Sequence, residues 1–564
     1  MRLFAYFCFL LITIVSSETA TYSLTVSPTT TYPDGVKKDS TLTFNSQFPG
    51  PLLSAKVGDR FVITLKNEFS RPTAVHWHGL YQKGSQFHDG PAMVTQCPLK
   101  PGKSQTFNFS TAGQAGTFWY HGHYRSQYTD GLIGPMIIYD PAEPAYFGYD
   151  AELILILSDW YHTNYTENED FYLATGIPPF PNSPLINGKG IYPCAVFPGG
   201  FGTLLRTPNC YPERQQRHIF SVQPGRTYRI RVINASALST FTFSIDGHKL
   251  VAIEVDGVAL KEPSKKADFA YIAAGQRYSF LMRMDKPAKK YLIRSIMKDD
   301  FVNLFPRTVP NINRFVEDTL LQKATAILSY DSEMTSPTPI ASTEPFSYFK
   351  YATIPPDSRK SFDLLDDQEL SLIPKDDDTA PCHVDIEFVL NIELNLSTER
   401  SPRSLFNRSR YVGNHTADPL LIQVVKGVKL KETTNPLYVD TNKSVQIVIN
   451  NFEPWAHPIH LHGHHFWVVA KGSGVFIANI STISETTVKR DTVMLDKNSY
   501  VVLRFVADNP GVWPLHCHID WHNTGGMSMT LVEGRDDLVG IEIPEQIQKM
   551  CADWKENLSY SEND

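Results

Sequence analysis

The stretch at residues 513–529, WPLHCHIDWHNTGGMSM, constrains this chain more than any other. It places His516, Cys517 and His518 at consecutive positions of a predicted strand. Because side chains on a strand alternate between its two faces, the two histidines point one way and the cysteine points the other. A three-residue unit therefore reaches two different environments.

Both environments have the composition of a metal site. A cysteine thiolate with two imidazoles and a distant methionine is the ligand set of a blue-copper electron-transfer site. His522 and Met527 follow Cys517 and can complete such a set. The two histidines on the opposite face must then serve a second centre. For this segment alone, the alternative is a histidine-rich surface strand with a structural cysteine.

Three further histidine motifs argue against that alternative: HWHG at 76–79, WYHGH at 119–123 and HPIHLHGH at 457–464. One His-x-His pair is common on ordinary strands, but four pairs, the last reading HCH, form a specific signal. Eight imidazoles suit a cluster of three coppers with open positions for a small oxidant. The predicted cluster ligands are His76, His78, His121, His123, His460, His462, His516 and His518.

His457 is the predicted second imidazole of the mononuclear site, beside Cys517 and His522. It lies three residues before His460 and directly before Pro458, where the chain can turn it to the other side. Imidazole alone suits copper, zinc and iron, but the cysteine, histidine and methionine set singles out copper. Two histidines break the pattern and are expected to orient ligands or to stabilise the fold: His464 and His465.

Short alternating runs dominate the rest of the chain, as in RFVITLKN from Arg60, RTYRIRVIN from Arg226 and SVQIVIN from Ser444. Glycine, proline and asparagine separate them, and long helical periodicity is scarce. The sequence therefore predicts an all-β protein of sandwich or barrel domains. Because the histidine motifs lie near both ends of the chain, the first and last domains must face each other.

The chain of 564 residues is long enough for three or four domains. The histidines of the expected middle domain lack the spacing of metal ligands. A later stretch rich in Ser, Thr, Pro and Asp is typical of an exposed linker. The predicted segments are a signal peptide at 1–17, a first domain at 21–141, a second at 145–330, the linker at 331–380, a third domain at 381–535 and a C-terminal tail at 536–564.

Several features predict a secreted, soluble glycoprotein. An apolar run at 3–15 follows Met1 and Arg2 and is typical of a secretory signal peptide. No later run reaches the roughly 18 apolar residues of a membrane span. The net charge of -7 gives no excess of basic residues of the kind that binds nucleic acid. Nine N-x-S/T sequons are present, at Asn108, Asn164, Asn234, Asn395, Asn407, Asn414, Asn442, Asn479 and Asn557.

Six cysteines follow the signal peptide, and export should oxidise most of them. If Cys517 binds copper, one of the remaining five cannot pair within the chain. Cys194 and Cys210 flank one loop and are candidates for a local bridge. Cys97 and Cys551 could form a second bridge, which would tie the first domain to the tail. Cys382 would then remain unpaired. The sequence alone does not fix this connectivity.

The four histidine motifs, in this order and spacing, resemble those of the multicopper oxidases: laccases, ascorbate oxidases and yeast-type iron oxidases, with a fungal source expected. The resemblance covers nearly the whole mature chain and includes TQCP, QYTDGLIGPMIIYDP, LSDWYH, LINGKG and FSIDGHKL. It implies three cupredoxin-like Greek-key β-sandwich domains and four coppers: one type 1, one type 2 and a type 3 pair. It also implies that single electrons enter at type 1 and pass through Cys517 to His516 and His518, where four of them reduce O2 to water.

The resemblance also assigns roles to carboxylates and to the axial position. Asp89 and Asp520 look like the family's carboxylates near the three-copper cluster, with proton delivery and ligand orientation as their expected roles. The alternatives are a turn aspartate and a solvated strand-end carboxylate. Met527 occupies the axial position, where a thioether lowers the potential relative to an apolar residue, so a low- to medium-potential site is predicted.

The electron donor is less clearly indicated. The Cys-Asp pair that holds phenols in white-rot-type laccases corresponds to Ala237 and Leu238 here, and the partner of that cysteine corresponds to Thr129. Yeast-type iron oxidases carry an iron-binding glutamate where this chain has Asp159, which can still bind ferrous ion. Ascorbate oxidases share Met527 and a similar cysteine arrangement.

Together, the motifs and the resemblance predict a monomeric laccase-like oxidase of phenols or aromatic amines, with O2 as acceptor. Ferroxidase and ascorbate oxidase activities are the alternatives. A copper-binding electron carrier without turnover is a further hypothesis from another class. The complete set of eight cluster histidines argues against it, because a carrier needs only the mononuclear site.

Overall fold

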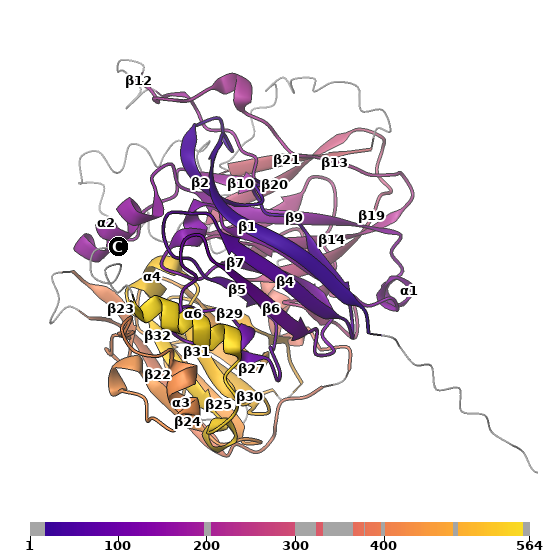
Figure 1. Ribbon diagram of the computed structural model, residues 1–564. Coiled ribbons are helices and arrows are strands. Elements are labelled where there is room, and N and C mark those ends of the chain that lie inside the picture. Colours follow the sequence, from indigo (N-terminus) through magenta and orange to yellow (C-terminus); the bar gives the residue numbers. More distant parts are fainter. Residues whose placement is uncertain are drawn as a thin grey trace, which may run out of the picture.

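The computed structural model describes residues 17–196, 205–298, 323–330, 365–376, 378–395, 401–477, 483–484 and 486–556. Residues 1–16 of the predicted signal peptide lie outside this part of the chain. Three pairs of β-sheets follow one another along the sequence; in Figure 1 the second pair lies toward the top and the third toward the bottom, and the second and third also contact each other directly. The all-β fold class with three cupredoxin-like sandwiches is thereby confirmed.

In the first sandwich, a sheet of order β2-β1-β4-β6 packs on one of order β3-β8-β7-β5. The alternation predicted from Arg60 is observed, since Phe61, Ile63 and Leu65 are fully buried between the sheets. Trp77 packs edge-on against Phe107 and joins the two layers. The strands are β1 Thr19–Thr31, β2 Lys38–Phe44, β3 Leu53–Lys56, β4 Arg60–Asn67, β5 Val75–His78, β6 Ser104–Ser110, β7 Gly116–Gly122 and β8 Ile133–Tyr139, with 3-10 helices η1 Gln86–His88 and η2 Gln127–Asp130.

The second sandwich pairs a sheet of order β10-β9-β14-β19-β16-β17 with one of order β13-β21-β20-β15-β18. The polar face of β14 is buried, because Arg231 donates to Glu152 and to Thr117 of the first sandwich. The strands are β9 Ala151–Trp160, β10 Ser183–Ile186, β13 Ile219–Ser221, β14 Thr227–Asn234, β15 Thr240–Ile245, β16 Ala252–Val255, β17 Val258–Ala259, β18 Ala270–Ile272, β19 Arg277–Arg283, β20 Lys290–Lys298 and β21 Lys323–Ser329. Also present are α1 Glu143–Phe147, α2 Tyr165–Thr175, η3 Pro212–Arg214 and the hairpin of β11 Ala195–Val196 and β12 Leu205–Arg206.

The third sandwich pairs a sheet of order β23-β22-β25-β30-β27-β28 with one of order β24-β32-β31-β26-β29. The strands are β22 Ile386–Asn395, β23 Arg403–Phe406, β24 Pro436–Val439, β25 Ser444–Asn451, β26 His457–Leu461, β27 Phe466–Ser473, β28 Lys489–Arg490, β29 Thr492–Leu495, β30 Ser499–Val506, β31 Gly511–Cys517 and β32 Ser528–Glu533. Its helices are α3 Leu420–Val425, η7 Glu432–Thr434, α4 Asp520–Thr524, α5 Arg535–Leu538 and α6 Glu545–Glu556.

The prediction of an exposed linker at 331–380 is wrong for the part that the structure describes. Residues 366–371 form the 3-10 helix η6 (Asp366–Ser371), and Leu365 and Leu372 are buried beside it. Glu369 pairs with Arg490 of the third sandwich. Hydrophobic residues interspersed in the polar composition therefore anchor the segment between two sandwiches.

Helix α6 ties the C-terminal tail to the first sandwich and crosses the front of the molecule in Figure 1. Cys551 on this helix forms a disulfide with Cys97, and Cys194 pairs with Cys210. Cys382 is free and exposed, whereas Cys517 is free and buried. Both candidate bridges and the unpaired cysteine are as the sequence suggested.

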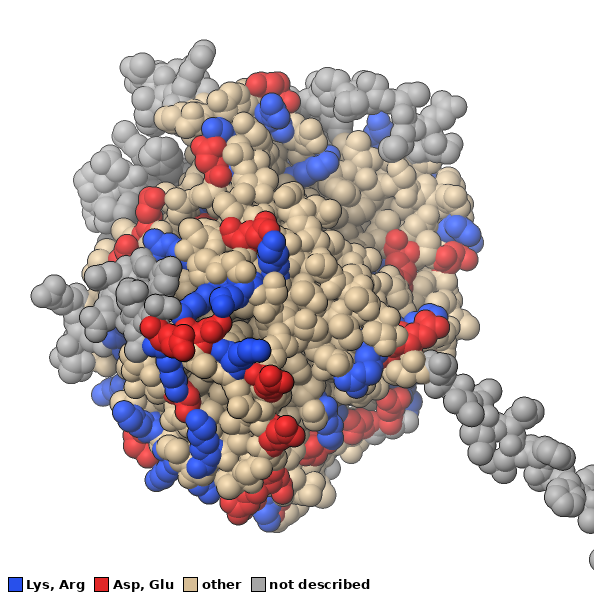
Figure 2. Space-filling view, in the orientation of Figure 1, with Lys and Arg blue, Asp and Glu red and all other residues tan. Residues whose placement is uncertain are grey.

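The surface carries both signs of charge. Lysine, arginine, aspartate and glutamate are interspersed on the face shown in Figure 2, without a region of one sign over any one element. Among the residues described, none of the helices has the length and apolar character needed to cross a membrane. One predicted sequon is unusable in the folded chain, because Asn234 is fully buried and its amide donates to the carbonyls of Ser239 and Ile272.

Candidate metal centres

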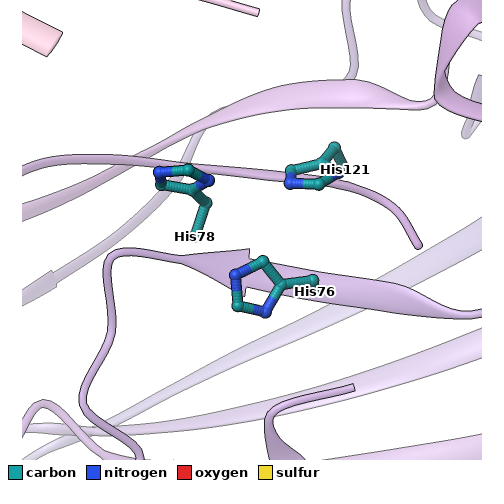
Figure 3. A group of neighbouring side chains, drawn as sticks. All are labelled: His76, His78 and His121. Atoms are coloured by element: carbon teal, nitrogen blue, oxygen red, sulfur yellow. The ribbon is translucent and has the colours of Figure 1, made fainter. Parts of the chain in front are cut away.

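The sheets place the four histidine motifs side by side in two pairs. In the first sandwich, His76 on β5 lies opposite His121 on β7. In the third, His460 on β26 lies opposite His516 on β31. Figure 3 shows the first pair of strands, with the rings of His76, His78 and His121 projecting into a common space. The hydrogen-bonded register of each sheet thus brings together motifs far apart in sequence.

The eight predicted cluster histidines converge where the first and third sandwiches meet. The ring of His76 stacks on that of His462 with centroids 3.9 Å apart, and His78 stacks on His460 at the same distance. His518 lies 5.0 Å from His78, and His123 lies 5.6 Å from His516, between ring centroids. The predicted grouping of all eight rings is therefore what the structure contains.

Several of the rings are held by one nitrogen and present the other to the centre. The Nδ1 atom of His76 donates to the Asp89 carbonyl at 3.0 Å, and that of His121 donates to the Gly122 carbonyl at 3.0 Å. The opposite nitrogens, Nε2 of His76, His121 and His460, are buried without a hydrogen-bond partner. Unpartnered buried nitrogens are costly unless a ligand satisfies them, so the site fits metal ions held by imidazole.

Burial favours the neutral imidazoles that bind metals. It lowers the pKa of His121, His462 and His518 well below the ordinary value, and neighbouring histidines add to the effect. For the same two reasons the pKa of His516 falls to about 3. Ligand histidines must be unprotonated to bind a metal, so the cluster is ready to do so at neutral pH.

The other face of β31 forms the predicted mononuclear site. The Cys517 sulfur lies 3.6 Å from Nδ1 of His457 and 3.6 Å from Nδ1 of His522, and the two nitrogens are 3.2 Å apart. All three side chains are buried. Burial raises the pKa of the Cys517 thiol, so a metal must displace that proton when it binds. Met527 is also buried, and its carbonyl accepts from the Cys517 N–H.

Two further residues near these centres were missed by the sequence analysis. Glu453, four residues before His457, accepts from Nε2 of that ligand at 2.9 Å. Asp491 accepts from the His460 ring through its carbonyl at 2.9 Å. The regular strand spacing that revealed the ligands does not extend to either residue, because both lie just outside a strand.

The predicted carboxylates lie beside the cluster. Asp89 Oδ2 accepts from Nδ1 of His462 at 2.9 Å. Asp520 is buried, and one of its oxygens has no hydrogen-bond partner. Burial raises the pKa of Asp520 well above its ordinary value, aided by Glu169 and Asp159 and opposed by a hydrogen bond from Ser126. Asp520 is therefore not the solvated strand-end carboxylate considered as an alternative, whereas Asp89 lies in a turn at the end of η1 and contacts His462 from there.

Asp159 does not have the free carboxylate expected of a donor-binding residue. One of its oxygens accepts from the N–H of Ala237, and the other accepts from those of Leu238 and Ser239. This geometry favours a clamp on the 237–239 loop over the predicted contact with a donor. Thr129 and Ala237, where related laccases are expected to carry a bridge, line a small cavity.

His464 and His465 are not among the side chains grouped at the two centres. The Nε2 atom of His464 lies 2.6 Å from Glu533 Oε2, and the Nδ1 atom of His465 lies 2.7 Å from the Tyr81 hydroxyl. The first contact lies within the third sandwich, whereas the second joins it to Tyr81 of the first. Their expected orienting or structural role agrees with these positions.

Comparison with known proteins points to one family. Three profiles described as multicopper oxidase match residues 25–143, 151–310 and 398–537. The chain is 33% identical to the iron transport multicopper oxidase fetC of Epichloe festucae over 93% of this chain and 78% of that one. It is 34% identical to laccase-5 of Trametes villosa, over 94% and 92% of the two chains.

Solved structures agree with the sequence relatives. The laccase of Botrytis aclada superposes with a TM-score of 0.78 at 29% identity, covering 97% of this chain and 93% of that one. Fet3p, described as a multicopper oxidase that functions in iron import, superposes with a TM-score of 0.76 at 26% identity, covering 95% of each chain.

Proposed function

Because the chain belongs to the multicopper oxidase family, an oxidoreductase family that uses O2, we propose that its electron donors are phenols or aromatic amines. Each donor molecule gives up one electron, and four electrons with four protons convert one O2 into two waters. Copper, when bound, supplies the one-electron redox change at both centres. The chain's own residues determine where electrons enter, how the centres are connected and where protons are held.

The observation that carries this proposal is the connection through β31. Cys517 contributes to the mononuclear site, and its two chain neighbours contribute to the eight-histidine cluster. Nδ1 of His516 also donates to the Cys517 carbonyl at 2.9 Å. An electron that reaches the sulfur can thus leave through the peptide to His518 or across this hydrogen bond to His516. A carrier protein would have no use for the second centre.

Protons are the second requirement of O2 reduction, and the chain can hold them beside the cluster. Asp520 follows the cluster ligand His518 by two residues, and its raised pKa favours the protonated acid. Asp89 contacts the cluster through His462. We assign proton delivery to both residues and orientation of His462 to Asp89.

Ferrous ion is the second candidate donor. Glu453 places a carboxylate directly on the mononuclear ligand His457, and its second oxygen has no hydrogen-bond partner. A hard cation prefers such an oxygen ligand. Glu453 is only 2% exposed, however, and the carboxylate of Asp159 is already occupied by three backbone N–H groups. These contacts favour a small organic donor over a hydrated metal ion.

The remaining features of the proposal concern location. The apolar segment at 3–15, the two disulfides and the exposed sequons at Asn108, Asn407 and Asn414 support a secreted glycoprotein. We expect the protein to act as a monomer outside the cell.

Oxygen uptake by purified protein tests the proposal. We expect kcat/KM for a dimethoxyphenol to exceed kcat/KM for ferrous ion and for ascorbate. Copper-depleted protein is the control and should take up no oxygen until copper is restored. A preference for ferrous ion by orders of magnitude would contradict the phenol assignment, and no uptake with any donor after copper restoration would contradict the oxidase.

A further inference from the structure

Asp491 lies behind the eight-histidine cluster, immediately before β29, and contacts ligands of two sandwiches. Its Oδ1 atom is 3.2 Å from Nε2 of His78, and its carbonyl accepts from Nδ1 of His460 at 2.9 Å. The two rings stack 3.9 Å apart at 12°. One buried residue thus contacts the ring nitrogen that faces away from the cluster in each of two stacked ligands, one from the first sandwich and one from the third.

Contact with Asp491 changes which nitrogen His78 presents to the cluster. Because its Nε2 atom faces Asp491, His78 turns Nδ1 inward, 3.3 Å from Nε2 of His518. His460 is held by Nδ1 and presents Nε2, which is buried and without a partner. Asp491 therefore sets opposite orientations for two neighbouring rings.

Arg277 on β19 holds Asp491 in place from the second sandwich. Its Nη1 and Nη2 atoms donate to the two oxygens of Asp491, each at 2.7 Å. A planar two-pronged contact of this kind fixes direction as well as distance. The guanidinium is itself fixed, because it also donates to the carbonyls of Thr117, Gly275 and Asp256 at 3.0–3.1 Å.

The turn that carries Arg277 also touches a third ligand. A Cβ atom at Gly275 would lie 2.7 Å from Cδ2 of His518, and the backbone there has a φ of +86°. Only glycine combines this conformation with such a close approach. The 275–277 turn of the second sandwich therefore packs directly against the His518 ring.

We propose that Arg277 and Asp491 are positioning residues of the three-copper centre. The second sandwich, to which none of the predicted ligands belongs, sets the geometry of the centre through them. Asp491 selects the inward nitrogens of His78 and His460, and Arg277 fixes Asp491. The proposal rests on the oxidase function proposed above and concerns the cluster alone, so the mononuclear site should not respond to changes at either residue.

The test compares Asp491→Asn with the wild-type holoprotein. We expect unchanged blue absorption and unchanged reduction of the mononuclear copper by a dimethoxyphenol without oxygen. The copper content or the magnetic coupling of the copper pair should fall. The rate of turnover when reduction of oxygen is limiting should drop by about 10–100-fold, because removing a partner that orients a metal ligand usually has an effect of this size. Arg277→Lys keeps the charge without the two-pronged contact and should show a smaller loss of the same kind.

Glu533→Gln is the matched control, because it alters an equally buried carboxylate whose histidine partner, His464, is not a predicted ligand. It should leave coupling and oxygen kinetics unchanged. Four coppers, normal coupling and normal oxygen kinetics in Asp491→Asn would overturn the proposal, as would equal effects in the control. If Asp491→Asn does not fold, Arg277→Lys takes its place in the test. Four coppers with normal coupling and oxygen kinetics in that variant, or effects equal to those in the control, would then overturn the proposal. Failure of the oxidase function itself would appear in the wild type as absent oxygen uptake.

Discussion

Asp89 of the first sandwich accepts a hydrogen bond at 2.9 Å from His462 of the third, across the interface that contains the eight-histidine cluster. The carbonyl of the same residue accepts from His76 at 3.0 Å. A single aspartate therefore fixes one ligand from each side of the interface. Its position makes the geometry of the cluster depend on the docking of two sandwiches.

Replacing Asp89 should impair oxygen reduction more than donor oxidation. Asp89→Asn keeps an acceptor for His462 but removes the charge and the capacity to carry a proton. We expect a fall in kcat of about 10–100-fold. Stopped-flow measurement should find normal reduction of the mononuclear copper without oxygen and slow reoxidation with it. Equal slowing of both half-reactions would contradict the assignment.

Met527→Leu should raise the potential of the mononuclear copper. Met527 is fully buried three residues after the end of helix α4, which carries His522, and a thioether near the metal stabilises the oxidised state. Redox titration of the blue absorption band measures the change. Met529→Leu is the control, because that residue is buried two positions further along and should leave the potential unaltered. No rise in Met527→Leu would remove Met527 from the axial position.

Loss of the Cys97–Cys551 disulfide should destabilise the fold while leaving the metal centres intact. The bridge joins residues 454 positions apart and fixes helix α6 to the first sandwich. Removing a native disulfide usually costs about 2–5 kcal/mol. For the double variant Cys97→Ser, Cys551→Ser we expect a lower Tm with unchanged blue absorption. Cys382→Ser, at the exposed free cysteine, should leave the Tm unchanged.

His88 should make stability fall between pH 6.5 and pH 4. Burial, with a smaller effect of Arg60, lowers its pKa to about 4. The unfolded chain binds a proton near pH 6.5 and the folded chain does not, so acid favours unfolding across this interval. The shift corresponds to at most about 3 kcal/mol. In His88→Phe, the free energy of unfolding should decline less over this range than in the wild type; parallel curves would exclude this role.

The candidate metal ligands could be predicted from the sequence because their spacing is a property of strands. Alternation on a strand puts His516 and His518 on one face and Cys517 on the other, and no tertiary information is needed. His457 also follows from this alternation: it lies three residues before His460 on β26 and so faces the other side, and the turn expected at Pro458 is not present. The all-β class followed from the same periodicity, visible in runs such as the one that begins at Arg60, whereas the cupredoxin-like form of the domains followed from the family resemblance.

Residues that act across sandwiches could not be predicted in this way. Asp491 and Arg277 are 214 positions apart and meet only because the second and third sandwiches pack together. Glu453 reaches His457 from a turn, where no regular period applies. Asp159 was predicted to contact a donor because its neighbours match a motif, and the 237–239 loop that occupies its oxygens is distant in sequence. The packed segment at 365–372 was misread because its composition is mostly polar.

The strand that carries Cys517 is an inner strand, hydrogen-bonded to β26 on one side and to β32 on the other. The spacing between the two redox centres is consequently set by bond lengths and sheet pairing, while the three-copper pocket is assembled from separate sandwiches. Thermal motion of the sandwiches can alter how the pocket closes around oxygen, but it cannot lengthen the path that an electron travels to reach it.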